Sequence, residues 1–186
     1  MVGLMACSGS STSPSPGSVL NLMMTDAPFQ NAKAVLVTFN EVSAHASGGD
    51  WKTLPFAGNP APKMRTCDLK KLEGNKTDIL GTGPLDPGHY TQVRLVVFSA
   101  TIYFDNPTDP LAPACGDAAT FAVPASITPP APLTVVSGEV KLTREFDVPQ
   151  GGVTTMLVDF QGAQSIFLTG TGDYKMTPVI TVVSVQ

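Results

Sequence analysis

The sequence predicts an all-β protein, an antiparallel β-sandwich or Greek-key barrel with about 8–10 short strands and one long Pro-rich loop. Apolar and polar residues alternate over short runs with a period of two, which is typical of strands, and we find no helical period over ten or more residues. The 17 Gly and 17 Pro supply breaks between such strands. Hydrophobic residues make up 42% of the chain and charged residues 14%, a composition too apolar for disorder.

A length of 186 residues predicts one folded domain, which we place at residues 19–186, behind a tail at residues 1–18. A chain of this length can bury a sizeable core without a metal or a dense set of disulfides. The net charge is −4, and the 11 Lys and Arg residues are scattered. Duplex binding requires clustered basic residues, so we expect no nucleic-acid partner.

The tail begins with a short motif that ends in a cysteine. Leu4-Met5-Ala6-Cys7 resembles the lipobox of bacterial lipoproteins, in which the Cys is acylated, although Met5 is a loose fit. Residues 8–18 are rich in Ser, Pro and Gly, as in a flexible tether. We therefore predict a lipid at Cys7 and a place at the bacterial outer membrane or cell surface, outside the cytoplasm. The alternative is a disordered N-terminus with an accidental Cys.

Too few residues precede Cys7 for a whole signal peptide, so we expect these residues to be the remnant of a longer one. In a Gram-negative host, Ser8 after the Cys would resemble an outer-membrane rather than an inner-membrane sorting signal.

The first half of the domain contains several short strand patterns. Pro28 cannot continue a ladder, so we expect the first strand to end at residues 25–28, with Asp26 closing an Asx-turn. The residues after the fourth strand, Leu69 to Gly74, suggest a single helical turn. The predicted strands are Val19–Met24, Ala34–Phe39 (continued or followed by a bent strand at Glu41–Ala46), Trp51–Phe56 and Met64–Leu69.

The longest β-type run lies between Leu85 and Phe104. Gly81 to Pro84 reads as a connection into it, and Pro87 and Gly88 have the chemistry of a type II turn. Both faces of the strand that starts at Tyr90 become apolar, which predicts a central position in a sheet. Because this run exceeds the usual strand length, we expect a bend or bulge near Ser99-Ala100.

A long loop from Asp105 to Pro132 follows, and its only strand-like piece is Thr120 to Val123. Strands return at Leu133–Val148, with an interruption at Ser137-Gly138. The last strand, Val179 to Val185, is apolar enough to be buried on both faces. The remaining predicted elements are a turn at Pro149–Gly152 and strands at Val153–Phe160, Ser165–Thr169 and Tyr174–Met176.

These motifs, in this order, resemble a bacterial family known as domain of unknown function 4382. The resemblance implies an exported β-sandwich of prealbumin-like or carbohydrate-binding-like type, often on lipoproteins, and it implies no activity. The long loop and Cys67 depart from the family pattern. The residues that carry the resemblance are Leu22–Pro28, Ala34–Thr38 with Glu41-Val42, Trp51, Thr66–Leu69, Leu85–Val97, Leu157–Phe160, Ser165-Ile166, Tyr174–Met176 and Pro178–Ile180.

The cysteines allow one prediction about a covalent bond. If Cys7 is acylated, Cys67 and Cys115 remain as a pair in an oxidising compartment. We predict a disulfide between them, which would tie the long loop to the body of the domain. The alternative is two separate thiols.

Side chains that could carry catalysis or bind metal are sparse. There is no Gly-x-Ser-x-Gly elbow, so we expect no enzyme, no catalytic residue and no cofactor. Two His-carboxylate pairs are close in sequence, His45 with Glu41 and His89 with Asp86, but surface histidines are commoner than ligands and we predict no metal. The loop oxygens that calcium could use, in a spacing that matches no known motif, belong to Asp105, Asn106, Asp109 and Asp117.

Aromatic side chains could stack on sugar rings, although in a sandwich they more often belong to the core. The candidate ligand contacts are Trp51, Tyr103, Asp105, Asn106 and Asp109. The leading hypothesis is a lipid-anchored surface or periplasmic module, binding or structural, whose partners are the membrane and a glycan or protein. The alternative is a subunit of an extracellular fibre or pilus-like assembly joined by strand addition.

Overall fold

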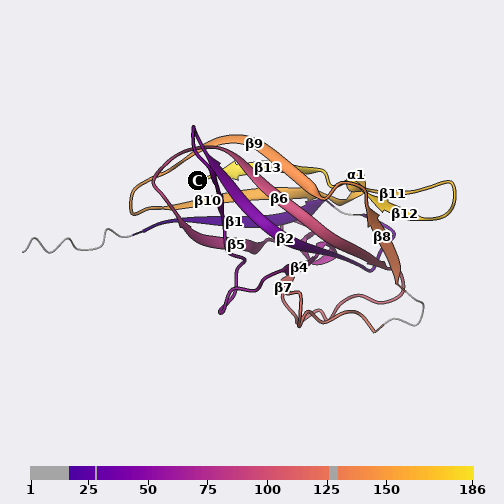
Figure 1. Ribbon diagram of the computed structural model, residues 1–186. Coiled ribbons are helices and arrows are strands. Elements are labelled where there is room, and N and C mark those ends of the chain that lie inside the picture. Colours follow the sequence, from indigo (N-terminus) through magenta and orange to yellow (C-terminus); the bar gives the residue numbers. More distant parts are fainter. Residues whose placement is uncertain (1–16, 28, 126–129) are drawn as a thin grey trace, which may run out of the picture.

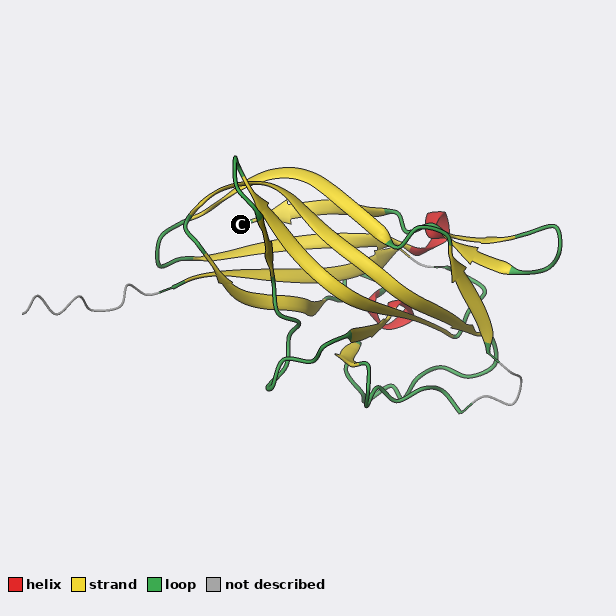
Figure 2. Ribbon diagram, in the orientation of Figure 1, coloured by secondary structure: helices red, strands yellow, loops and turns green. Residues whose placement is uncertain are grey.

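The computed structural model describes residues 17–27, 29–125 and 130–186, and nearly all of its regular structure is β (Figure 2). Two sheets pack face to face, which confirms the predicted all-β sandwich (Figure 1). Both sheets are mixed rather than purely antiparallel, because β1 runs parallel to β10 and β8 runs parallel to β12. The described residues form thirteen strands, more than the sequence predicted, since several strands of three residues show little periodicity.

The first sheet has four strands in the order β13-β10-β1-β5. β1 (Ser18–Ala27) and β10 (Val153–Gln161) form its centre, and every second residue of each is buried. β13 (Ile180–Val185) lies at one edge with Val183 exposed, so the predicted burial on both of its faces is wrong. β5 (Asp78–Leu85) lies at the other edge and includes Gly81–Pro84, which was predicted as a connection.

The second sheet is built on two long antiparallel strands, β2 (Ala34–Ala46) and β6 (Gly88–Tyr103), which pair over almost their whole length. Their outer neighbours change midway. β6 pairs with β9 (Glu139–Val148) along its first half and with β8 (Ala131–Val135) near its end. β2 pairs with β4 (Arg65–Asp68) along its first half and with β3 (Trp51–Thr53) along its second. The central position predicted for the Tyr90 strand is therefore confirmed.

The elements that remain are short. Leu69 to Leu72 form the predicted helical turn, η1, capped by Asp68. β7 consists of Cys115–Asp117, inside the loop that the sequence left almost without strands, whereas Thr120 to Val123 form no strand. The others are α1 (Gly162–Ser165), β11 (Ile166–Leu168) and β12 (Tyr174–Met176). No helix among the described residues is long and apolar enough to cross a membrane.

β6 changes its buried face at the predicted irregularity. Thr38 pairs with Ser99 and Phe39 with Val97, so Phe98 is an extra residue without a counterpart on β2. The buried positions are Val93, Leu95 and Val97 before this bulge and Ala100 and Ile102 after it. An extra residue reverses the alternation of faces, because side chains alternate with a period of two. The bulge thus lets one strand keep its apolar residues in the core along its full length.

Two predicted turns connect the sheets to each other. The turn before Gly88 joins β5 of the first sheet to β6 of the second, and residues 149–152 join β9 to β10. Gly88 has a φ of 154°, positive as expected, but further from the type II value of about 80°. Neither turn closes a hairpin, because the strands it connects are not hydrogen-bonded to each other.

Asp26 departs from its predicted role. It lies inside β1, points into the sandwich with 6% of its surface exposed, and closes no Asx-turn. The strand continues through Thr25–Ala27 because these residues pair in register with Asp159–Gln161 of β10. Backbone pairing with a neighbouring strand therefore overrides the local turn preference of Asp.

Candidate functional site at the disulfide-anchored loop

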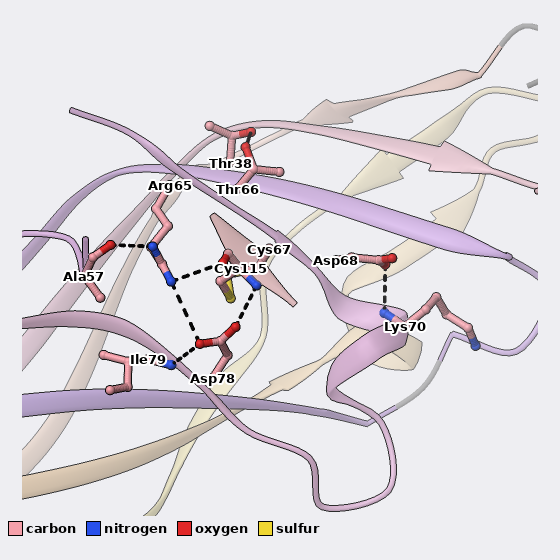
Figure 3. The surroundings of a disulfide bond; sticks show 10 residues. All are labelled: Thr38, Ala57, Arg65, Thr66, Cys67, Asp68, Lys70, Asp78, Ile79 and Cys115. Atoms are coloured by element: carbon pink, nitrogen blue, oxygen red, sulfur yellow. Dashed lines mark hydrogen bonds and ion pairs between the residues drawn. A yellow bond between two sulfur atoms is a disulfide. The ribbon is translucent and has the colours of Figure 1, made fainter. Parts of the chain in front are cut away.

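The long loop after β6 is attached to the body of the sandwich by a covalent bond. Cys67 of β4 and Cys115 of β7 form a disulfide, which confirms the pairing predicted from the sequence (Figure 3). β7 also pairs with β4 as a short antiparallel ladder, with Thr66 opposite Gly116 and Arg65 opposite Asp117. The middle of the loop is thus an extra edge strand of the second sheet.

An ion pair between the buried Arg65 and the half-buried Asp78 supports this attachment (Figure 3). The Asp78 carboxylate accepts the Cys115 N–H at 2.8 Å, and Arg65 Nη2 donates to the Cys115 carbonyl at 3.2 Å. Arg65 also donates to the Ala57 carbonyl, and its Nη2 lies 3.9 Å from Asp78 Oδ1. Burial lowers the pKa of the Arg65 guanidinium, and the nearby Asp78 carboxylate opposes that shift. Both charges therefore hold the backbone of Cys115 in place.

A second polar contact holds the start of the loop. The Thr108 hydroxyl donates to Asp68 Oδ2 at 2.5 Å, and the N–H groups of Val35 and Lys70 donate to Asp68 Oδ1, each at 3.1 Å. Burial raises the pKa of Asp68, and these three hydrogen bonds oppose the rise. Lys71 adds to the attachment by donating to the carbonyls of Asp109 and Ala112.

The end of the loop lies over the outer face of the second sheet. The core-facing residues of β2 are Val35, Val37 and Phe39, whereas Ala34 and Leu36 form a separate buried cluster with Tyr103, and Phe121 packs against it. A Cβ on Gly116 would lie 3.2 Å from the Phe121 ring, so this ring is seated closely against β7. Phe121 therefore covers a part of the sheet that would otherwise face solvent.

Two hollows adjoin the Phe121 ring, and together we call them the loop groove. The first, the hydroxyl hollow, has a volume of about 170 Å³. The second, the Lys71 hollow, has a volume of about 210 Å³. The hydroxyl hollow is lined by Leu36, Thr38, Thr66, Ser99, Ala100, Thr101, Tyr103, Ala118, Phe121 and Val123, and the Lys71 hollow by Lys71, Thr108, Ala112, Pro113, Gly116, Asp117, Thr120, Phe121 and Ala122.

The hydroxyl hollow has a floor of strand hydroxyls. Thr38 of β2 lies opposite Thr66 of β4 on one side and Ser99 of β6 on the other, so three hydroxyl side chains form a row across three adjacent strands. The Thr38 and Thr66 hydroxyls are 2.8 Å apart and share a hydrogen bond. Thr101 of β6 lines the same hollow.

Only Tyr103 among the five predicted ligand contacts lines the groove. Trp51 lies beside the first half of β6, with the Arg94 guanidinium 4.5 Å from its ring centre. Arg94 and Tyr103 are nine residues apart on one strand, so the Trp51 surface is about 30 Å from Tyr103. The two aromatic side chains cannot contact one small ligand.

The predicted acidic and amide contacts serve the fold of the loop. Asp105 Oδ1 accepts the Asn106 N–H at 2.9 Å, and Asp109 Oδ1 accepts the Leu111 N–H at 2.9 Å. The Asn106 side chain donates to the Ala125 carbonyl. Asp117 Oδ1 accepts the Ala119 N–H at 3.0 Å. Across residues 17–27, 29–125 and 130–186, no three His, Cys, Asp or Glu side chains gather as a metal site.

The two histidines do not pair with the carboxylates nearest in sequence. His45 Nδ1 lies 3.2 Å from the Thr91 hydroxyl, while Glu41 pairs with Arg94. His89 Nδ1 lies 2.9 Å from Asp147 Oδ1 across the β6–β9 pairing. Strand pairing, which sequence proximity does not show, selected these partners.

Sequence reasoning missed Phe121 and the hydroxyl row. Phe121 was predicted to lie in a strand, and Thr38, Thr66, Ser99 and Thr101 were not among the predicted ligand contacts. Thr38 and Thr66 each follow or precede a core residue of their strand, Val37 and Cys67, so they lie on the opposite face of the sheet. Their meeting required the register of β2 with β4 and β6, which is a tertiary property.

Comparisons with known proteins gave one match. A family model described as a domain of unknown function, DUF4382, matches residues 17–178. No curated protein and no solved structure matches the chain. The match covers the whole sandwich except β13, whose bounds are Ile180–Val185, and it includes the loop groove.

Proposed function

Since the chain belongs to the DUF4382 family, whose name assigns no activity, we propose from its geometry that it is a lipid-anchored extracytoplasmic binding module whose ligand occupies the loop groove. The observation that carries the proposal is the rigid attachment of a long surface loop around two adjoining hollows. Loops of this length without structure of their own are uncommon in compact domains unless they serve a function. Here a disulfide, a largely buried ion pair and a buried Asp–Thr hydrogen bond attach residues 108–115 of the loop to the sandwich.

The position of the groove fits a tethered domain. β1 starts at Ser18, directly after the Ser/Pro-rich residues, and runs toward the end of the sandwich where β6 finishes and the loop begins (Figure 1). The Lys33 N–H donates to the Tyr103 carbonyl at 2.8 Å, so the connection between β1 and β2 contacts the end of β6, where the loop starts. A tether attached before Ser18 would leave the loop end facing away from the membrane.

The disulfide also agrees with an extracytoplasmic location, because disulfides form and persist in oxidising compartments. The proposed acylated residue, Cys7, lies outside the described residues. Its lipidation is tested by detergent phase partition and by the intact mass of the N-terminal peptide from the producing bacterium. Cys7→Ser should move the protein from the detergent phase to the aqueous phase. An unmodified Cys7 in the mature protein would remove the anchoring part of the proposal.

Binding at the groove is tested by photo-cross-linking on intact cells. A benzophenone amino acid at Thr120, an exposed residue that lines the Lys71 hollow, should give a discrete cross-linked product. The same amino acid at Thr143, an exposed position on β9, is the matched control. Equal products at the two positions, or none at either, would refute the groove as the binding surface.

We place the fibre hypothesis second, because the sheet edges have features that hinder strand addition. Residues 55–57 cover the β5 edge, since the Thr82 N–H donates to the Pro55 carbonyl and Phe56 forms a bridge with Gly81. The β13 edge has a bulge at Val183, and the β9 edge carries five charged residues. Bulges and charges protect natural sheet edges from pairing with other chains. Filaments in negative-stain images of the purified protein would reverse this ranking.

A further inference from the structure

The chemistry of the hydroxyl hollow identifies a class of ligand. We infer that the hollow binds one unit of a neutral saccharide chain, an inference that rests on the proposed binding function of the loop groove. Its polar groups are the hydroxyls of Thr38, Thr66, Ser99, Thr101 and Tyr103, and its lining residues include no Lys, Arg, His, Asp or Glu.

Hydroxyl groups match a sugar better than they match an ion. Each hydroxyl can donate one hydrogen bond and accept two, as each sugar hydroxyl can. A phosphate or carboxylate ligand is held mainly by Arg, Lys or backbone N–H groups, which give charge-assisted bonds. The lining residues of the hydroxyl hollow include no cationic side chain, so the hollow lacks the charge-assisted bonds with which Arg and Lys hold an anion.

Two of these hydroxyls have unused bonding capacity. The Thr38 and Thr66 hydroxyls bond to each other. The side chains of Ser99 and Thr101 make no hydrogen bond to any residue in the described part of the chain. Ser99 is exposed and Thr101 is half-buried, so both hydroxyls can reach a ligand that enters from solvent.

Aromatic and aliphatic side chains of the hydroxyl hollow match the apolar face of a sugar ring. Phe121 forms one wall of the hollow, Tyr103 lines it from the end of β6, and Val123 is 63% exposed at its rim. Sugar rings present an apolar C–H face as well as hydroxyls, and small-molecule sites combine aromatic walls with a few placed polar groups. The half-buried Phe121 and the exposed Val123, beside a hydroxyl floor, fit the apolar face and the hydroxyl groups of one sugar unit.

The size of the hollow limits how much ligand it covers. Its volume of about 170 Å³ is below the usual range for sites that enclose a whole drug-sized ligand, about 300–1,000 Å³. The hollow therefore takes one unit of a longer chain, and the rest of that chain extends over the sheet surface. We expect weak binding per unit, with affinity gained from several copies of the protein on one cell surface.

The test is titration of the full domain with six neutral hexasaccharides, namely those of β-1,4-glucose, α-1,4-glucose, β-1,3-glucose, β-1,4-xylose, β-1,4-mannose and β-1,4-N-acetylglucosamine. Calorimetry and affinity gel electrophoresis are run at 50 and 500 mM NaCl. Polygalacturonate and heparin are the anionic comparisons. We expect at least one neutral hexasaccharide to bind, with less than a twofold change in affinity between the two salt concentrations.

Side-chain variants localise any binding. Thr101→Val and Ser99→Ala remove the two free hydroxyls, and each should weaken binding at least fivefold. Phe121→Ala should abolish it. Thr143→Val is the matched control, because Thr143 is an exposed strand threonine outside the groove, and it should bind as the unchanged protein does. Circular dichroism and thermal unfolding of each variant separate a lost site from a lost fold.

Different results would overturn the saccharide inference and the proposed binding function. Failure of all six neutral hexasaccharides to bind, or binding unaffected by Thr101→Val and Phe121→Ala, would overturn the saccharide inference. Salt-sensitive binding of the anionic polymers alone would also overturn it. In either case a discrete cross-link from Thr120 would leave the proposed binding function standing, so the two proposals fail separately.

Discussion

The backbone N–H of Gly162 donates to Asp26 Oδ1 at 3.2 Å, while Asp26 Oδ2 is buried and makes no hydrogen bond in the described part of the chain. This single hydrogen bond links β1 to the start of α1. Burial raises the pKa of Asp26 to about 8, and the nearby carboxylates Glu73 and Asp159 raise it further, against the opposing effects of Gly162 and Lys70. The folded protein therefore holds Asp26 as a neutral acid at neutral pH.

The first prediction concerns the pH dependence of stability. The folded-state pKa of Asp26 is above its ordinary value, so protonation of Asp26 stabilises the folded state. This stabilisation is fully present below about pH 4 and is lost as the pH rises toward 8. Asn has the same shape as Asp but does not ionise, so Asp26→Asn should remove this pH-dependent loss. At pH 8 the variant should be more stable than the unchanged protein by about 1–4 kcal/mol.

Urea unfolding of both proteins between pH 4 and 9 measures this difference. Asp50→Asn, at an exposed position in the turn between β2 and β3, is the matched control and should leave the pH profile unchanged. Parallel stability profiles for Asp26→Asn and the unchanged protein would show that Asp26 does not titrate in this way.

The second prediction concerns the disulfide. Cys67 and Cys115 are 48 residues apart, and closure of a loop of this length stabilises the folded state by about 4 kcal/mol in chain-entropy terms. The double variant Cys67→Ala, Cys115→Ala should lose about that amount of unfolding free energy in urea. Alkylation of the unchanged, unreduced protein after unfolding should label neither Cys67 nor Cys115, and labelling at both positions would contradict the bridge.

The third prediction concerns the hydrogen bond between Thr108 and Asp68. Thr108→Val removes a buried donor and leaves Asp68 Oδ2 without it, so we expect a loss of about 1–3 kcal/mol. Hydrogen exchange of the amides of residues 105–117 should become faster, because this contact holds the start of the loop. Thr143→Val, at an exposed position, should change neither quantity. Unchanged exchange in Thr108→Val would mean that the loop does not depend on this contact.

The fourth prediction concerns the glycine next to the bulge in β6. A Cβ on Gly138 would lie 2.2 Å from the Val97 carbonyl oxygen, so the backbone would have to move. The Val97 N–H also donates to the Gly138 carbonyl at 2.8 Å, and such a movement would break this bond. Gly138→Ala should therefore destabilise the protein by about 2–4 kcal/mol. Gly170→Ala, where a Cβ meets nothing within 4 Å, should change stability by less than about 0.5 kcal/mol in the same thermal unfolding assay.

The positions of strands were predictable wherever buried residues alternate with more exposed ones. β1 and β10 show this alternation over nearly their full length, and both strands were placed within a few residues. The bulge in β6 was predictable because the apolar run was too long for one regular strand. Gly81–Pro84 was misassigned because its residues are typical of turns, yet pairing with Val19–Leu22 of β1 holds them in a strand.

The groove could be predicted only in part. Tyr103 was named as a contact from its residue type and its place at the end of a strand. Asp105, Asn106 and Asp109 were named because polar side chains in a loop are candidates for binding, but these side chains bond to the backbone of the loop itself. Phe121 became part of the groove only because Gly116, opposite Thr66, leaves room for its ring.

The sequence alone therefore determined the fold class, the main strands and the Cys67–Cys115 pair, because periodicity, turn residues and cysteine count are local or additive properties of a chain. The tertiary structure decided which strands are neighbours, how Asp26 is buried and where the loop lies. Those outcomes depend on register between residues far apart in the chain, such as Thr38 with Thr66 and Ser99. The hydroxyl row exists only in that register, since a shift of one residue would turn each of these side chains to the other face of its strand.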